Sequence, residues 1–264
     1  MLIRSTWTLT VDAFTTLPKT YQLALSKQLH AQAGLDFGNE SIPSVTYSGI
    51  SGRDSSVEDF ITFSPDEFYT LSLNGLNEPA SKAIEALDLS EHLEFLGARF
   101  KVINREDEAT SYEALYHRFV ADEPEPVRRL AFSFSTPTAF SQHRTYLPLP
   151  VPTLMFHSWL ERWNHFSPVY LGADELIEYF GGSIALSRHR IQTRSYSLDR
   201  GFVTGFTGTV NLKVLRHSDP LLANVAELLA NYAQFVGTGI KTRLGMGETV
   251  LNTERNLSNL KQDL

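Results

Sequence analysis

A glycine-rich segment near the C-terminus has the residue types and spacing that suit phosphate binding. It reads Gly237-Thr-Gly239-Ile-Lys241-Thr-Arg243-Leu-Gly245-Met-Gly247. Glycine allows a positive φ and a close ligand approach, and amide N–H groups beside a lysine or arginine can cradle an anion. We therefore expect a phosphate of a nucleotide or a nucleic acid to contact Gly237, Gly239, Lys241, Thr242, Arg243, Gly245 and Gly247. A glycine-rich turn between a helix and an edge strand is the alternative.

Two common nucleotide motifs do not fit this segment. A P-loop has its second glycine directly before Lys-Ser/Thr, where this chain has Ile240. A dinucleotide fingerprint follows the first strand and opens a helix, whereas this segment follows a helical pattern and precedes a strand pattern. The segment is therefore neither kind of mononucleotide pocket.

The histidines are the candidates for acid–base chemistry. Eight are present, none paired at metal-ligand spacing, and the chain has no cysteine, so we expect no metal site and no cofactor. Histidine suits proton transfer because its ordinary pKa of about 6.5 lies near neutrality. His30 follows Leu29 in a helical pattern, about 100° from the apolar stripe, with Lys27 three residues earlier on the same side. A solvated surface histidine is the alternative.

A second basic cluster lies in an extended pattern at Arg188-His189-Arg190-Ile-Gln-Thr-Arg194. In a strand, Arg188, Arg190 and Arg194 share a face because side chains repeat with period two. Such a row could follow a nucleic-acid backbone, or it could be a solvated hairpin face. The net charge is −7, but residues 36–127 hold 19 acidic and 6 basic side chains, and residues 128–217 hold 10 basic and 5 acidic ones. The second half therefore supplies the local positive charge that a polyanion requires.

Composition indicates a globular protein, and the order of the expected elements indicates an α+β fold. No apolar run approaches the ~18–20 residues of a membrane span, and the N-terminus lacks a signal-peptide pattern, so we expect a cytoplasmic protein with no membrane partner. The first half alternates elements in the order β-α-β-β-α-β, as a ferredoxin-like domain does. The expected elements are strands at 2–11, 44–50, 67–74 and 93–102, and helices from Pro18 to about Gly34 and from Pro79 to about Leu87.

The same order repeats after the acidic, proline-bearing segment Asp122-Glu-Pro124-Glu-Pro126. Strands are expected at 130–135, 184–196, 202–216 and 247–252, and helices at 153–163 and 220–236. We therefore predict two tandem ferredoxin-like domains, residues 1–125 and 126–264. Two aromatic sets have core spacing, namely Phe156, Trp159, Trp163 and Phe166 on a helix and Phe202 and Phe206 on a strand.

Several stretches, in this order and spacing, resemble one family. They are Leu17-Pro18, Val45-Thr-Tyr47-Ser48, Phe68-Tyr-Thr-Leu-Ser-Leu-Asn-Gly-Leu76, Phe132-Ser-Phe-Ser-Thr-Pro137-Thr-Ala-Phe140, Gly205-Phe206-Thr-Gly208-Thr-Val210 and Gly245-Met-Gly247. Together they are similar to the CRISPR repeat-processing endoribonucleases of the RAMP superfamily. The resemblance implies two ferredoxin-like domains that bind the repeat of a precursor RNA and cut it once per repeat without a metal. The 2′-OH attacks the adjacent phosphate and leaves a 2′,3′-cyclic phosphate and a 5′-OH.

The resemblance also implies roles for particular residues. It places a catalytic His or Tyr late on the first helix or just beyond it. This selects His30, the only histidine in the first 91 residues, with Lys27 and Tyr47 as its candidate partners. The strand that carries Arg188, His189, Arg190 and Arg194 corresponds to a hairpin that contacts the repeat stem-loop. Some relatives carry a lysine shortly after the first helix, where this chain has Gly34-Leu-Asp-Phe-Gly-Asn-Glu-Ser41.

Two other functions fit the same sequence. A non-catalytic RNA-binding subunit of a CRISPR effector complex shares the fold and the glycine segment but needs no His30. An α+β scaffold without a nucleic-acid role needs neither. Cleavage of repeat RNA in EDTA identifies the enzyme, and a salt-dependent RNA complex excludes the scaffold.

Overall fold

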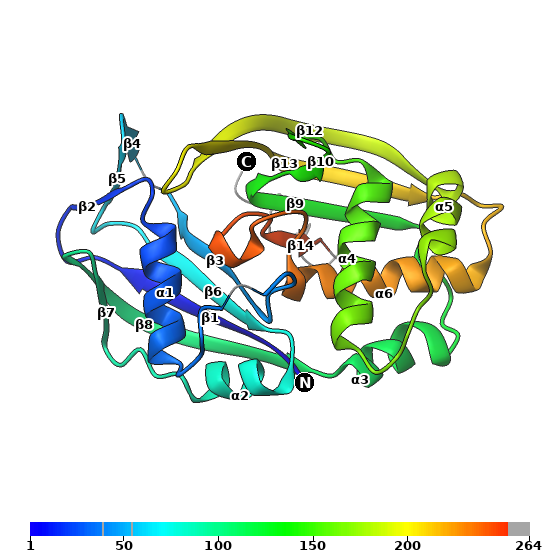
Figure 1. The fold of residues 1–264 in the computed structure, drawn as a ribbon, viewed down its shortest axis with the longest axis horizontal. Helices are drawn as coiled ribbons and strands as arrows, with labels where there is room; N and C mark the ends of the chain where they lie inside the picture. The colour runs from blue at the N-terminus through cyan, green and yellow to red at the C-terminus, as the bar shows by residue number, and fades with distance from the viewer. Residues whose placement is uncertain (39, 54, 253–264) are drawn as a thin grey trace. The chain divides into compact units, whose positions relative to one another are not determined.

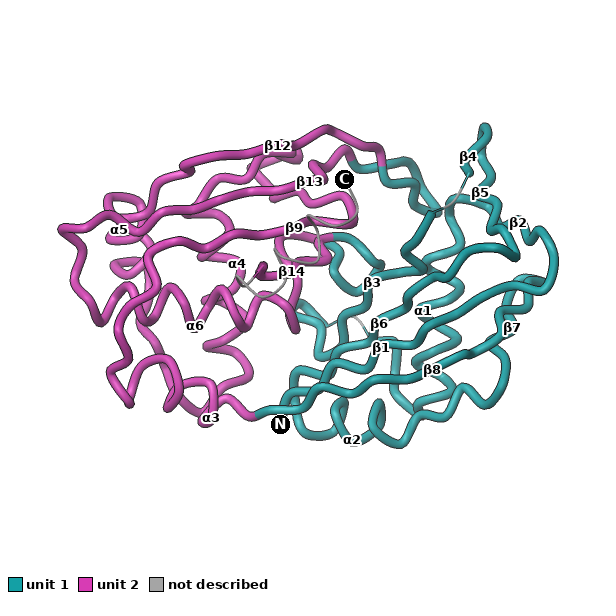
Figure 2. Tube along the Cα trace, turned by 180° about the vertical axis from the view of Figure 1, so that it is seen from behind, with its two compact units in different colours: residues 1–110, 196–203, 241–246 teal, residues 111–195, 204–240, 247–264 magenta. Residues whose placement is uncertain are grey.

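A computed structural model describes residues 1–38, 40–53 and 55–252. The chain divides into two compact units, coloured separately in Figure 2. Unit 1 comprises Met1–Thr110, Tyr196–Val203 and Lys241–Met246, and unit 2 comprises Ser111–Ser195, Thr204–Ile240 and the residues from Gly247 onward. Each unit therefore combines segments that are far apart in the sequence.

The main sheet of unit 1 has the strand order β3-β6-β1-β8-β7 (Figure 1). Its strands are β1 (Leu2–Thr10), β3 (Val45–Gly52), β6 (Tyr69–Gly75), β7 (His92–Phe95) and β8 (Ala98–Thr110), and its helices are α1 (Gln22–Gln32) and α2 (Glu78–Ala86). β1 lies between β6 and β8 and pairs antiparallel with both. This arrangement confirms the ferredoxin-like prediction for the first half.

Alternation along β1 determines how the helices of unit 1 pack. Ile3, Trp7 and Leu9 face one side of the sheet and are buried. Leu25 and Leu29 of α1 and Ala80 and Ile84 of α2 join the same core cluster. Both helices therefore cover one face of the sheet, and the buried side of α1 consists of Leu25 and Leu29, with Tyr21 at its N-cap.

Two boundaries in unit 1 differ from the predicted ones. Pro18 does not open the first helix but ends β2 (Thr15–Pro18), which forms a small sheet of order β2-β5-β4 with β4 (Ser55–Val57) and β5 (Phe60–Phe63). Proline tolerates a strand end as well as a helix start because both accept its fixed φ. The stretch expected as one strand at 93–102 is a β7–β8 hairpin that turns at Leu96 and Gly97, where φ is positive.

Unit 2 has a four-stranded sheet of order β12-β13-β9-β14. Its strands are β9 (Arg129–Thr138), β12 (Ile184–Ser197), β13 (Phe202–Val214) and β14 (Thr249–Leu251), and its main helices are α4 (Pro152–Phe166) and α6 (Pro220–Val236). This order repeats the ferredoxin-like topology and confirms the second prediction. Phe156, Trp159 and Trp163 are fully buried, as predicted, and Phe166 is half-buried.

Unit 2 also holds elements that the pattern of the sequence did not predict. They are a short helix α3 (Tyr112–Tyr116) that continues into a π-helical turn (His117–Ala121), the hairpin β10 (Phe140–Gln142) and β11 (Thr145–Leu147), and the helix α5 (Asp174–Ser183). Residues 111–125 belong to unit 2. The centroid of the Tyr112 ring lies 5.1 Å from that of the Trp163 ring and 5.7 Å from that of the Tyr232 ring.

One predicted core aromatic is on the surface. Phe206 is fully buried, but the side chain of Phe202 is 67% exposed. Phe202 is the first residue of β13 and directly follows the turn of the β12–β13 hairpin. Among the described residues, no helix is both long enough and apolar enough to cross a membrane.

Candidate functional site

His30 lies in the last turn of α1 and is buried, with only 6% of the residue exposed. The residue lies off the stripe formed by Leu25 and Leu29, as expected, but it is not solvated as the alternative of a surface histidine required. The chain after α1 returns over this side of the helix, and the Phe37 ring packs edge-on against the imidazole with 4.8 Å between ring centroids. The loop that carries Phe37 therefore encloses part of the imidazole.

The hydrogen bond at Nδ1 of His30 defines the tautomer of its neutral ring. Nδ1 lies 2.8 Å from the backbone oxygen of Ser26, one turn earlier on α1. A carbonyl oxygen only accepts, so Nδ1 carries the proton and Nε2 is the acceptor in the neutral ring. Burial lowers the pKa of His30 below its ordinary value of 6.5, and the positive charge of Arg243 lowers it further. The hydrogen bond to Ser26 and the carboxylates of Glu40 and Asp36 act in the opposite direction. The neutral base is therefore the main form at neutral pH.

Arg243 and His30 line one cavity of about 190 Å³, which also borders Asp36 and Glu40. The Arg243 guanidinium lies over the Phe37 ring, 4.6 Å from its centroid, and donates to the backbone oxygen of Gly38. The backbone oxygen of Arg243 accepts a 3.0 Å hydrogen bond from the Ser26 hydroxyl. These contacts place a cation from the glycine segment beside the imidazole. The sequence predicted both residues separately, but not that they meet.

The two expected partners of His30 lie in different surroundings. Lys27 is exposed on α1 and is not among the residues that line the His30 cavity. Tyr47 is 4% exposed and its hydroxyl donates to the backbone oxygen of Gln22. Burial raises the pKa of Tyr47 well above 10. In this structure Tyr47 thus ties β3 to the first turn of α1, and a catalytic role for it remains a prediction.

The first and last parts of the glycine segment are embedded in unit 2. The backbone N–H groups of Thr238, Gly239, Ile240 and Gly247 all donate to protein oxygens. A Cβ on Gly239 would lie 2.2 Å from the backbone oxygen of Ala139, and one on Gly247 would lie 2.1 Å from that of Thr238. These N–H groups are therefore not the open anion cradle that we expected, and these glycines are required by close backbone packing.

The middle of the segment is a single 3₁₀ turn (Thr242–Leu244) in unit 1. Lys241 precedes it in the left-handed conformation with φ 56°, and Gly245 follows it with φ 89°. The Thr242 side chain is buried, whereas Lys241 and Arg243 are partly exposed. The two cations are therefore the members of the segment that a ligand can reach most directly.

The basic cluster of β12 is on the surface. β12 is the edge strand of the unit 2 sheet, and Arg188, His189, Arg190 and Arg194 are all exposed. Their positions leave both faces of this strand open to solvent along residues 186–190. Contact with a nucleic acid is thus sterically available and remains a prediction.

Two residues that matter for these segments were not predicted. Phe37 covers His30, and Arg162 on α4 donates to the backbone oxygen of Gly239 at 2.6 Å and to that of Ser158 at 2.8 Å. Arg162 is only 9% exposed. A charge between Trp159 and Trp163 on the apolar stripe of a helix was the available signal, because a buried arginine requires acceptors.

Comparisons with known proteins give sequence matches to one family. Residues 132–249 match the family model of the CRISPR-associated endoribonuclease Cas6. The chain is 34% identical over 120 residues to a CRISPR-associated endoribonuclease Cas6 of Mycobacterium tuberculosis, which covers 46% of this chain and 38% of the relative. A Cas6 of Streptococcus thermophilus is 24% identical over 124 residues, 47% of this chain and 50% of the relative. The matched segments thus span half or less of these relatives.

Solved structures resemble the chain over nearly its whole length. A Cas6 product complex superposes with a TM-score of 0.72 at 21% identity and covers 96% of this chain and 100% of that one. Thermus thermophilus Cas6 gives 0.70 at 22% identity, with 96% and 98% covered. A Cas6-related protein of Pyrococcus furiosus gives 0.64 at 14% identity, with 96% and 100% covered. The tandem ferredoxin-like fold is therefore shared. The sequence matches confirm the resemblance to the CRISPR repeat-processing endoribonucleases over slightly less than half of the chain.

Proposed function

We propose that this chain is a metal-independent endoribonuclease that binds CRISPR repeat RNA and cleaves the precursor transcript within each repeat. The pairing of His30 with Arg243 in one cavity is the observation that carries this proposal. The sequence match to Cas6 over residues 132–249 supports the substrate, as do solved Cas6 neighbours described as product and substrate-mimic complexes.

In the proposed mechanism His30 is the general base. Its Nδ1–H is held by Ser26, so Nε2 accepts the proton of the ribose 2′-OH. The 2′-oxygen then bonds to the adjacent phosphorus, and the bond from phosphorus to the 5′-oxygen breaks. The products are a 2′,3′-cyclic phosphate and a 5′-OH end. The leaving 5′-oxygen takes up a proton from water, because neither Lys27 nor Tyr47 lines the His30 cavity.

In this proposal Arg243 stabilises the transition state. The phosphorus centre gains negative charge in the transition state. A fixed cation beside it therefore stabilises the transition state more than the bound substrate, which lowers the barrier. Arg243 is fixed because its guanidinium is held by Phe37 and Gly38. The exposed arginines of β12 and Lys241 then hold the RNA by its phosphates.

The ends of the product RNA test this reaction. Wild-type protein with excess EDTA should cut labelled repeat RNA at one position and leave a 2′,3′-cyclic phosphate. A repeat RNA with a 2′-deoxy sugar at the cleaved nucleotide should bind and remain intact, because the nucleophile is absent. Cleavage of the 2′-deoxy RNA, or products with 5′-phosphate ends, would contradict the mechanism.

A non-catalytic RNA-binding subunit of a CRISPR effector complex is the second candidate. The segment that matches the family model contains the glycine segment and β12 but not His30. Such a subunit would bind repeat RNA with the same salt dependence and leave it uncut. The EDTA experiment distinguishes the two because only the enzyme yields a product.

A further inference from the structure

A second cavity lies at the turn between β12 and β13. It has a volume of about 250 Å³, and all of its lining residues belong to unit 1. Its walls include the aliphatic side chains of Leu23, Leu198 and Leu244. This volume lies below the roughly 300–1,000 Å³ of cavities for drug-sized ligands. The hairpin-turn cavity therefore suits a group about as large as one nucleobase.

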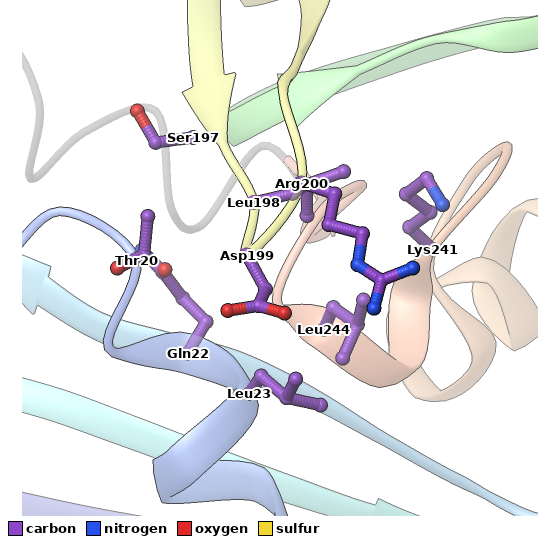
Figure 3. A pocket seen from close by; sticks show the side chains of 9 residues that line it. All are labelled: Thr20, Gln22, Leu23, Ser197, Leu198, Asp199, Arg200, Lys241 and Leu244. Atoms are coloured by element: carbon purple, nitrogen blue, oxygen red, sulfur yellow. The ribbon is translucent and has the colours of Figure 1, made fainter.

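Two unpaired charges of opposite sign enter this cavity. Asp199 and Arg200 are the central residues of the turn, which is closed by a hydrogen bond from Leu198 N–H to Gly201 O of 3.0 Å. Figure 3 shows both side chains extending from the turn toward Leu23 and Leu244. Within the described part of the chain neither side chain forms an ion pair. Both residues are exposed, so a ligand can reach them from solvent.

The geometry points to a binding site for an unpaired guanine of the RNA, and this inference rests on the proposed function. Guanine presents two adjacent donors, N1–H and N2–H₂, which one carboxylate can accept together. Its O6 and N7 are acceptors of the kind that arginine binds. Asp199 thus accepts from the Watson–Crick edge, Arg200 donates to O6, and the leucine walls cover the faces of the base.

The other bases fit this pair less well. Adenine and cytosine place a ring nitrogen acceptor beside their amino group, so its lone pair would face the carboxylate. Uracil offers one N–H between two carbonyl oxygens, which repel a carboxylate in the same way. Single-stranded bases that are splayed from the RNA are the usual targets of such readout.

Two further lining residues support a nucleotide at this place. Lys241 borders the cavity and can contact the phosphate of the same nucleotide. Gln22 also borders it, and its Oε1 is buried with no hydrogen-bond partner among the described residues. The cavity thus combines an apolar wall, acceptors, and cations from three separate segments.

Base substitution in the RNA tests the site without disturbing the protein. Short unstructured RNAs would be compared by fluorescence anisotropy, each an oligouridylate with one central guanine, inosine, adenine or cytosine. We expect wild-type protein to bind the guanine RNA about tenfold more tightly than the inosine RNA, which lacks N2–H₂. Asp199→Asn should remove this preference, while Asp66→Asn, at an exposed position outside the cavity with the same charge change, should keep it.

The outcomes separate this inference from the proposed function. Cleavage of repeat RNA by wild-type protein together with equal affinity for guanine and inosine RNAs would overturn the guanine site alone. A guanine preference that survives in Asp199→Asn, with an unchanged melting temperature, would overturn the assignment to this cavity. Absence of both cleavage and RNA binding would overturn the proposed function and the guanine site together.

Discussion

At the scale of single residues, the surroundings of His30 favour a base over an acid. The imidazole is buried, its Nδ1–H is held by Ser26, and Arg243 stands beside it. Burial and the neighbouring cation both disfavour the protonated ring. A general base works best when it is unprotonated at the working pH and still binds a proton in the transition state.

The pH dependence of cleavage follows from the lowered pKa of His30. The single-turnover rate should rise with pH on an acid limb whose midpoint lies below 6.5 and should level off by neutral pH. Arg243→Gln removes one cause of the lowered pKa, so its limb should move to higher pH and its plateau rate should fall. Rates from pH 5 to 8 measure both effects. A rate that falls as pH rises through this range would contradict the base assignment.

The pH dependence of folding stability should also report the lowered pKa of His30. The pKa of His30 is lower in the folded than in the unfolded protein, so the unfolded chain binds more protons just below pH 6.5. Its contribution to stability is therefore lost as pH falls from 6.5 toward the folded pKa. Urea unfolding at several pH values should show a smaller acid-side loss for His30→Gln than for wild type. Equal slopes for the two proteins would contradict the shifted pKa.

At the scale of elements, close backbone packing explains why the glycine segment has glycine at positions 239 and 247. Gly239 and Gly247 approach backbone oxygens too closely for a Cβ, and Arg162 and Ser158 hold Gly239 from α4. A substitution at either glycine should therefore disturb the fold before it disturbs any ligand contact.

Substitution at Gly247 tests this reading. Gly247→Ala combines a positive φ of 76° with a clash against the Thr238 backbone, so the free energy of unfolding should fall by more than ~2 kcal/mol. Gly97→Ala is the matched control, since Gly97 has a φ of 78° but nothing within 4 Å of the added Cβ. It should cost only about 1–2 kcal/mol. Equal losses for both variants would mean that packing at Gly247 is loose.

Most elements were predictable because their patterns are local. Alternation along 2–11 and the helical spacing of Tyr21, Leu25 and Leu29 identify β1 and α1 with their buried faces. Helix α5 was missed because its buried residues are few, mainly Leu176 and Phe180. Its last turn also contains Gly181 and Gly182, which are poor helix formers. The meeting of His30 with Arg243 was not predictable, because the two residues lie more than 200 positions apart in the sequence. Long-range contacts of this kind leave no periodic signal.

At the scale of the whole molecule, charge is unevenly distributed along the chain. Residues 36–127 are strongly acidic, whereas residues 128–217 are basic in balance. An RNA should therefore be attracted to the basic segments and repelled from the acidic ones. The exposed arginines of β12 are the largest local group of such cations in a single described element.

Salt titration measures how many phosphates these cations bind. The logarithm of the binding constant for repeat RNA should fall with log salt concentration by about 0.7–0.9 per phosphate contact. Arg188→Ala and Arg190→Ala should each reduce the slope by roughly one contact. Arg99→Ala, an exposed arginine on β8 in the acidic part of the chain, should leave the slope unchanged. A flat titration for wild type would contradict the basic surface altogether.

The central claim is that His30 performs the chemistry while other residues hold the RNA. Single-turnover cleavage of labelled repeat RNA, with protein in excess and EDTA present, tests it most directly. His30→Ala should slow cleavage by about 10²–10⁴-fold and bind the RNA with an affinity close to that of wild type. His157→Ala, at an exposed position on α4, should cleave normally. Near-wild-type cleavage by His30→Ala would contradict the account.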